Sequence, residues 1–383
     1  MQPNKKALIA VNLSGFMWFL MDDIDILRSM GYEVDVVADN RFGESHTLKE
    51  LERRGARFIE VRCDSKSPFT RENFNGYRKY RRLLKDQKYN LIICHTPIVG
   101  FLLRLASLGL RKKGCKIIYV SHGLAWTSLS DAKTRTKYRL IEDFGSRLCD
   151  AIITINKDDK AEAEKLHCPN VFQIDGVGCD IAKYRDVVVN GDKKRKEIGV
   201  PTDKILILAV GEISVRKNHR IVAEALALLE NKDRYVYVIC GREHGGSSIS
   251  EGIMSFAKEN GVNVRLLGFR KDVNELCHVA DIGVIPSLRE GLGMAGIQQL
   301  CAGVPVIGTA VQGIKEYVKN GETGVTVKNP YDAREFAEAI LFLSDKAVRD
   351  EMKSSCLNIV NKFSLQHSID QRKHIYDEVL STK

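Results

Sequence analysis

Apolar and polar positions follow a regular pattern in the first half of the chain, where short apolar runs are separated by longer amphipathic segments. We interpret the short runs as buried strands, at residues 7–11, 33–38, 58–61, 91–94, 116–121 and 151–155. Strands separated by helical segments of this length form right-handed crossover units on a parallel sheet. The pattern therefore predicts a doubly wound α/β domain.

The same alternation returns in the second half, with short apolar runs at residues 205–210, 235–240, 264–267, 282–286 and 304–308. A chain of 383 residues is longer than a single core usually supports. We therefore expect two domains of the same Rossmann-like architecture, joined by a polar, charged linker around residues 180–200. The predicted boundaries are residues 1–185, residues 186–364, and a C-terminal helix at residues 365–383 that packs back on the first domain.

A glycine-rich stretch at residues 287–300 follows one of these apolar runs and leads into a segment with helical periodicity. Gly291, Gly293 and Gly296 let the backbone approach a ligand closely, and the start of the next helix offers free N–H groups to anionic oxygens. Glu290 lies on the turn. It is either an ordinary neighbour of the helix start or a ligand-binding carboxylate. A carboxylate in an anion-binding loop needs compensation, which a nucleotide sugar supplies through its phosphates and hydroxyls.

Gly15, His122 and His95 lie at predicted strand ends, where ligands of parallel sheets bind. Gly15 follows the first strand and either caps a turn or lies against a diphosphate. No G-x-G-x-x-G fingerprint accompanies it, which argues against an NAD-dependent oxidoreductase. His122 follows the run at residues 116–121, and His95 is similarly placed. Each is either structural or a hydrogen-bonding partner of a sugar.

Arg216 and Lys217 occupy the loop after the run at residues 205–210. One interpretation is that both are ordinary surface charges that bind no ligand. Two cations on a loop at the ligand-binding edge would, however, neutralise a nucleoside diphosphate leaving group. We favour this interpretation.

The formal net charge is +10, while hydrophobic content of 44% and charged content of 28% are ordinary for a soluble globular protein. Basic residues are dense at residues 66–88, where phenylalanines and tyrosines are interleaved with them. These basic residues are Lys66, Arg71, Arg78, Lys79, Arg81, Arg82, Lys85 and Lys88. The run is either a solvated helix face or a surface for an anionic membrane or phosphorylated acceptor. Nucleic acid is disfavoured, because no nucleic-acid-binding motif accompanies the charge.

Ten cysteines are scattered without C-x-x-C spacing, which is typical of reduced, buried thiols. The first apolar run is too short for a signal peptide, and no run is long enough to span a bilayer. We expect a cytoplasmic protein that is at most peripheral at the inner face of the cell membrane.

The stretch at residues 287–307 resembles the signature S-x-x-E-G-x-G-x-x-x-x-E-A-x-x-x-G-x-P-V-I of the family 4 retaining glycosyltransferases of GT-B fold. Gly313, Glu316, Gly321 and Gly324 continue the match. The resemblance covers essentially the whole chain. It implies two facing Rossmann-like domains, one for the acceptor and one for the donor, and a C-terminal helix that crosses back. The implied reaction is transfer of a sugar from a nucleotide-activated donor with retention of configuration, and without a metal or other cofactor.

The resemblance also implies residue roles. Glu290 would bind hydroxyls of the donor sugar, His122 would contact the sugar near the reacting carbon, and Lys217 would grip the diphosphate. The backbone N–H groups of Gly293, Met294 and Ala295 would donate to sugar and phosphates, and Gly15 would lie under the diphosphate.

Two positions depart from the family pattern. Gln298 replaces the usual second glutamate, which accepts hydrogen bonds from the ribose, so donor binding should weaken without being lost. Glu212 replaces a usual arginine, and we expect Arg216 to substitute for that cation.

These features favour an active glycosyltransferase that uses a nucleotide-sugar donor, with uridine as the expected base. The acceptor would be a lipid-linked or saccharide substrate in capsular or exopolysaccharide assembly. The alternative is a partner subunit that binds nucleotide sugars through a weakened site. An epimerase or phosphorylase on the same fold fits the Glu290 signature less well.

Overall fold

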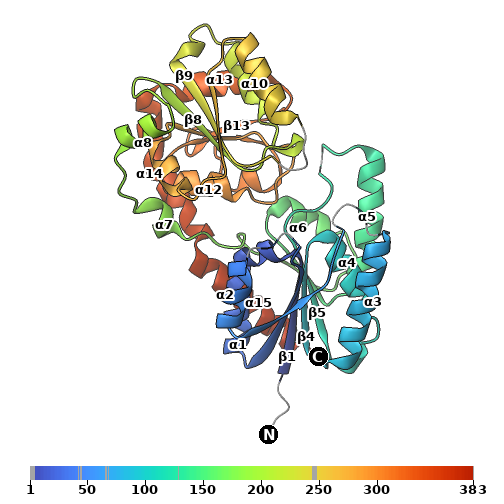
Figure 1. Cartoon of the computed structure of the whole chain (residues 1–383). Coiled ribbons are helices and arrows are strands. Elements are labelled where there is room, and N and C mark those ends of the chain that lie inside the picture. The colour runs from blue at the N-terminus through green and yellow to red at the C-terminus, as the bar shows by residue number, and fades with distance from the viewer. Residues whose placement is uncertain are drawn as a thin grey trace. The chain divides into compact units, whose positions relative to one another are not determined.

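The computed structural model describes residues 5–382 except residues 42, 44, 65, 66, 68, 128 and 244–247, so Lys66 lies outside the described residues. The chain divides into two units (Figure 1). The first comprises Met1–Gly178 and Gln366–Lys383, and the second comprises Cys179–Leu365. The first boundary thus lies seven residues before the expected one at residue 185.

The first unit is built on a parallel sheet with the order β3-β2-β1-β4-β5-β6-β7. Its strands are β1 (Lys5–Leu13), β2 (Tyr32–Asp39), β3 (Ala56–Glu60), β4 (Leu91–His95), β5 (Lys116–Ser121), β6 (Ala151–Thr154) and β7 (Val171–Gln173). The predicted strands of this half are confirmed, because each short apolar run overlaps a strand of the sheet, and all of these strands except β3 are largely buried.

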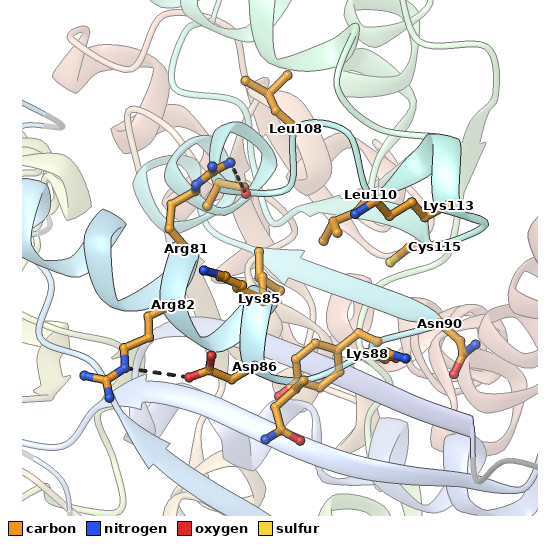
Figure 2. A pocket seen from close by; sticks show the side chains of 14 residues that line it. Arg81, Arg82, Lys85, Asp86, Lys88, Asn90, Leu108, Leu110, Lys113 and Cys115 are labelled. Carbon is orange, nitrogen blue, oxygen red and sulfur yellow. Dashed lines mark hydrogen bonds and ion pairs between the residues drawn. The ribbon is translucent and has the colours of Figure 1, made fainter.

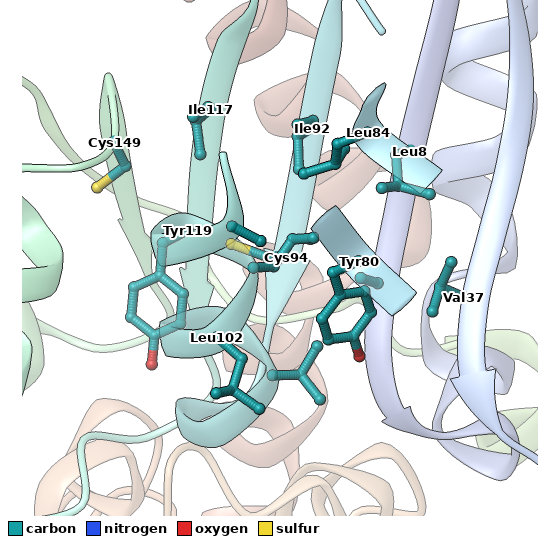
Figure 3. Close-up of a cluster of buried hydrophobic side chains, with 14 of the residues drawn as sticks. Leu8, Val37, Tyr80, Leu84, Ile92, Cys94, Leu102, Ile117, Tyr119 and Cys149 are labelled. Carbon is teal, nitrogen blue, oxygen red and sulfur yellow. The ribbon is translucent and has the colours of Figure 1, made fainter. Parts of the chain in front are cut away.

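Helices connect these strands and cover both faces of the sheet. They are the 3-10 helices η1 (Ser14–Phe19) and η2 (Arg111–Lys113), with α1 (Met21–Ser29), α2 (Ser45–Arg53), α3 (Arg71–Asp86), α4 (Pro97–Ala106), α5 (Ala132–Ser146) and α6 (Lys157–Ala163). In Figure 1, α3, α4 and α5 lie on one side of the sheet. Figure 3 shows the core there, where Tyr80 and Leu84 of α3 pack against strand residues such as Leu8 and Ile92.

The C-terminal helix α15 (Leu365–Ser381) begins at the last residue of the second unit, and the rest of it belongs to the first unit. The Tyr376 hydroxyl donates to Asp23 Oδ1 of α1 at 2.7 Å, and Arg372 Nη1 lies 3.0 Å from Asp23 Oδ2. All three side chains are buried. A buried carboxylate needs such partners to stay charged, so this contact fixes α15 against α1.

A second parallel sheet, with the order β10-β9-β8-β11-β12-β13, forms the second unit. Its strands are β8 (Ile205–Val210), β9 (Tyr235–Cys240), β10 (Val264–Gly268), β11 (Ile282–Ile285), β12 (Val306–Thr309) and β13 (Gly324–Val327). The prediction of two doubly wound α/β units is confirmed. The edge strands β7 and β13, which both have half-buried positions, were not predicted.

The helices of the second unit also cover both faces of its sheet. They are α7 (Ile181–Arg185), α8 (Gly191–Glu197), η3 (Val215–Lys217), α9 (Arg220–Ala227), η4 (Lys232–Arg234), α10 (Ile249–Glu259), α11 (Val273–Val279), α12 (Met294–Cys301), η5 (Gln312–Glu316), α13 (Ala333–Leu343), α14 (Lys346–Ile359) and η6 (Val360–Phe363). Residues 180–200 were expected to be a linker, but they form α7 and α8. Lys194 of α8 lies 2.7 Å from Asp272, so its charge is paired by a residue far along the chain.

An ion pair is buried where α4, α5 and β5 meet. Arg104 Nη2 donates to Glu142 Oε2 at 2.8 Å, its Nε donates to the Gly100 carbonyl at 2.9 Å, and its guanidinium lies 4.0 Å from the centre of the Tyr119 ring. Removing one partner of a buried pair leaves an uncompensated charge, which is more costly than losing the pair.

We therefore predict that Glu142→Ala destabilises the protein by roughly 3–5 kcal/mol. The control is Asp86→Ala, which removes the partner of Arg82 from a pair at 3.7 Å whose side chains are 56% and 87% exposed. An exposed pair contributes at most about 1 kcal/mol. Urea denaturation measures both changes, and equal losses of stability would contradict the assigned role of the buried pair.

Candidate functional site

The glycine-rich stretch forms the turn between β11 and the start of α12, as the sequence predicted. Gly293 is the residue before α12 and has φ +77°, a left-handed conformation that favours glycine. A Cβ atom there would lie 2.8 Å from Tyr317 Oη. Met294 and Ala295 open the helix, and the first N–H groups of a helix have no acceptor within it. The turn can therefore present backbone donors to an anion.

Glu290 lies at the centre of this turn and is held by two cations. Its Oε2 atom accepts hydrogen bonds from Lys217 Nζ at 2.6 Å and from Arg216 Nη1 at 3.1 Å. Its side chain is only 15% exposed. Burial by itself would raise the pKa of Glu290, but the charges of Lys217 and Arg216 outweigh burial and lower that pKa below its ordinary value. Glu290 is therefore a carboxylate at neutral pH.

Arg216 lies between two carboxylates. Its Nη2 atom donates to Glu212 Oε1 at 2.9 Å, while Nη1 donates to Glu290. Burial by itself would raise the pKa of Glu212, but the bond from Arg216, the charges of Arg216 and Lys217, and the bond from Ser214 together lower it below its ordinary value. The unusual Glu212 thus pairs with the cation expected to substitute for the missing arginine. Together, Glu212 and Glu290 balance the formal charges of Arg216 and Lys217.

Further contacts fix this arrangement, and one of the segments that make them, η5, was given no function in the sequence analysis. The Leu288 N–H donates to the Arg216 carbonyl at 2.8 Å, which joins the glycine-rich turn to the basic loop. The side chain of Gln312 accepts from the Glu290 N–H at 3.2 Å. A Cβ atom at Gly313 would lie 2.1 Å from the Gly291 carbonyl oxygen, so η5 packs closely on the turn. Gly313 appeared in the sequence only as a continuation of the signature.

Gln298 lies on α12 and is half-buried. It follows Met294 by four residues, so the two side chains lie on the same face of the helix, near its N-terminal turn. This position is compatible with the predicted contact to a ribose. The neighbouring Gln299 is buried instead.

In the first unit, the predicted residues lie at the carboxyl ends of the strands. Gly15 is exposed within η1, directly after β1, and a Cβ atom there would meet no heavy atom within 4 Å. His122 follows β5, and its ring packs edge-on against Phe16 of η1 at a centroid distance of 4.8 Å. His95 ends β4, and its Nδ1 lies 2.9 Å from His122 Nε2. The structure thus brings His95 and His122 together, whereas Glu290, Arg216 and Lys217 gather in the second unit.

A basic pocket of about 890 Å³ lies elsewhere in the first unit (Figure 2). Asn90 and Cys115 line it and immediately precede β4 and β5, so the pocket lies at the opposite edge of the sheet from His95 and His122. Its cations are Arg81, Arg82, Lys85, Lys88 and Lys113. The basic run of the sequence therefore borders a cavity, which the sequence did not predict.

No group of three or more histidine, cysteine, aspartate or glutamate residues is placed to hold a metal ion within the described ranges. No helix in the described part of the chain is long and apolar enough to cross a membrane.

Comparisons with known proteins identify relatives of both units. Residues 24–174 match the family described as Glycosyltransferase Family 4, and residues 190–356 match the family described as Glycosyl transferases group 1. The chain is 30% identical over 326 residues to EpsD of Bacillus subtilis (strain 168), a glycosyltransferase by name, and the match covers 83% of this chain and 80% of EpsD. It is 25% identical over 381 residues to an Escherichia coli UDP-Gal:alpha-D-GlcNAc-diphosphoundecaprenol alpha-1,3-galactosyltransferase, with coverage of 97% and 95%.

Solved structures share the fold. Anabaena Alr3699/HepE, in complex with UDP and glucose, aligns with a TM-score of 0.79 at 18% identity and covers 98% of this chain and 100% of its own. WaaG, a glycosyltransferase involved in lipopolysaccharide biosynthesis, aligns with a TM-score of 0.72 at 18% identity, covering 96% and 99%. The two parallel-sheet units, the family matches and the extent of the match to EpsD agree. The chain therefore belongs to the family 4 glycosyltransferases of GT-B fold and is a glycosyltransferase.

Proposed function

We propose that this glycosyltransferase transfers a sugar from a nucleoside diphosphate donor, with retention of anomeric configuration, and that the donor is a UDP sugar. The observation that carries the proposal is the cluster of Glu290, Lys217 and Arg216 beside the N-terminus of α12. Cations and free backbone N–H groups suit a diphosphate, and a carboxylate suits sugar hydroxyls. Glu290 and His122 are the proposed sugar-contacting residues.

Charge balance explains how such a cluster can accept a donor. Glu290 is ionised and already bonded to both cations, so the site is compensated without substrate. An incoming diphosphate brings further negative charge, which Arg216, Lys217 and the first N–H groups of α12 can share. Because cationic side chains neutralise the leaving group, the proposed reaction requires no metal and no other cofactor. Gly293, Met294, Ala295 and Gln298 would complete the donor site, and Gly15 is proposed to approach the diphosphate.

The proposed acceptor is a lipid-linked or saccharide substrate in capsular or exopolysaccharide biosynthesis. The Escherichia coli relative is named for transfer from UDP-Gal to a GlcNAc-diphosphoundecaprenol. The basic residues of α3 support an approach to an anionic membrane, and Phe69 and Phe74 near its start are exposed. We propose that the protein is cytoplasmic and peripheral at the inner face of the membrane, and that it has no nucleic-acid partner.

A second candidate is a partner subunit that binds nucleotide sugars without efficient transfer. The bond between Arg216 and Glu212 favours it, because a paired cation is less available to phosphate. The two candidates differ in what they predict for Glu290.

We predict that Glu290→Gln lowers kcat/KM about 100-fold or more. The variant keeps the side-chain shape but removes the charge that strengthens hydrogen bonds from the sugar hydroxyls in the transition state. The control is Glu322→Gln, which changes an exposed carboxylate of the same unit. Turnover is followed by mass spectrometry of the glycosylated acceptor. If the Glu290 variant retained full cellular function, the binding-subunit candidate would be favoured.

A second prediction concerns Glu212. Replacing it with glutamine releases Arg216 from one of its carboxylates, so UDP should bind roughly threefold to tenfold more tightly, which corresponds to about 1 kcal/mol. The control, Glu224→Gln, removes a carboxylate from Arg220 in a pair of the same i,i+4 spacing at 2.7 Å. Isothermal titration calorimetry measures both affinities. Unchanged UDP binding in the Glu212 variant would remove Arg216 from the donor site.

A further inference from the structure

His95 and His122 form a pair of imidazole rings at the carboxyl ends of β4 and β5. Their ring centroids are 5.2 Å apart and their planes differ by 23°. The centroid separation is close to the sum of the 2.9 Å nitrogen–nitrogen distance and the two ring radii. The two nitrogens therefore lie near the line that joins the ring centres, which is the geometry of an in-plane hydrogen bond.

Both rings are neutral at physiological pH. Burial lowers the pKa of His95 to about 3, and the guanidinium of Arg372 acts in the same direction. Burial also lowers the pKa of His122, with His95 and Arg372 adding to the effect and Asp23 opposing it. A neutral imidazole has one N–H donor and one acceptor nitrogen. One ring of the pair must therefore donate, and the other must accept.

The surroundings of His95 decide which ring donates. His95 is buried, and its Nε2 atom has no hydrogen-bond partner among the described residues. If His122 donated from Nε2, neutral His95 would have to carry its own proton on Nε2, as an unpaired buried N–H. Buried N–H groups without partners are rare in proteins, because they lose their hydrogen bond to water. If the proton of His95 lies on Nδ1, it forms the 2.9 Å hydrogen bond to His122 Nε2. The buried Nε2 atom of His95 is then an unprotonated acceptor, and no N–H group is left without a partner.

We propose that His95 is a positioning residue that fixes His122 in one tautomer. His95 donates from Nδ1 to His122 Nε2, so the proton of His122 lies on Nδ1. His122 then acts toward the substrate as a hydrogen-bond donor and not as a proton acceptor, and its partner is a hydroxyl oxygen of the transferred sugar. The identity of that partner rests on the proposed function, whereas the tautomer does not.

The contact with Phe16 restricts the ring as well. The Phe16 ring packs edge-on against His122, so rotation of the imidazole is limited on that side. A side chain whose orientation and tautomer are both fixed loses less freedom when it bonds a substrate, which favours catalysis through preorganisation.

The test uses the full-length protein labelled with ¹⁵N in its histidines. Two-bond ¹H–¹⁵N correlation spectra distinguish the two tautomers of each ring. We expect the Nδ1–H tautomer for His122 in the wild type. In His95→Phe, which keeps an aromatic ring but removes the donor, His122 should lose this preference. His95→Asn places an amide donor near the position of Nδ1 and should restore it.

Activity provides the second readout. His95→Phe should lower kcat at least tenfold with little change in KM for the donor, and His95→Asn should recover most of the loss. The control is His374→Phe, because the His374 side chain on α15 is 80% exposed.

An Nε2–H tautomer of His122 in the wild type would overturn the proposal, as would an unchanged tautomer in His95→Phe. If the tautomers are as expected but no nucleotide sugar is turned over by the wild type, the proposed function fails and the assigned tautomer stands.

Discussion

The bond between Glu290 and the two cations of the basic loop is the interaction on which the proposed donor site depends. A carboxylate on a glycine-rich turn at a helix N-terminus would compete with any anionic ligand, unless its charge were already compensated. Lys217 and Arg216 provide that compensation from a different loop. The backbone bond from Leu288 to Arg216 keeps the two loops together, and Gly293 allows the turn to pass Tyr317. The site is therefore preorganised by contacts within the second unit.

The first unit uses a different chemistry at the corresponding strand ends. Its candidate residues His95 and His122 are neutral imidazoles, kept uncharged by burial and by the nearby guanidinium of Arg372. Arg372 is itself neutralised by Asp23, which also accepts from Tyr376. One set of residues is thus suited to charge neutralisation and the other to hydrogen bonding. Both sets lie where parallel sheets usually bind their ligands.

Strand positions could be predicted well from the sequence, because strands buried in parallel sheets are continuous apolar runs. The runs at residues 116–121, 205–210 and 235–240 match β5, β8 and β9 residue for residue. The passage at residues 180–200 was misassigned because its charges are paired by residues far along the chain, such as Asp272. Local composition contains no information about such partners.

The candidate site was predictable in part. The glycine-rich turn carries its own signal, since glycines, a carboxylate and a following helix are adjacent in the sequence. The pairing of Arg216 with Glu212 and the bond between His95 and His122 required the structure, because charge and histidine spacing do not show which atoms meet. The basic pocket at the far edge of the first sheet was hidden for the same reason: Arg81 and Lys113 come from segments whose proximity depends on packing.

The most direct test of the donor-site assignment is a screen of purified protein against a panel of nucleotide sugars, with a lipid-linked acceptor and detection by mass spectrometry. The donor-site assignment predicts release of UDP and a product heavier than the acceptor by one sugar residue, with at least one UDP sugar raising the melting temperature. The absence of both turnover and a thermal shift with every nucleotide sugar would contradict it.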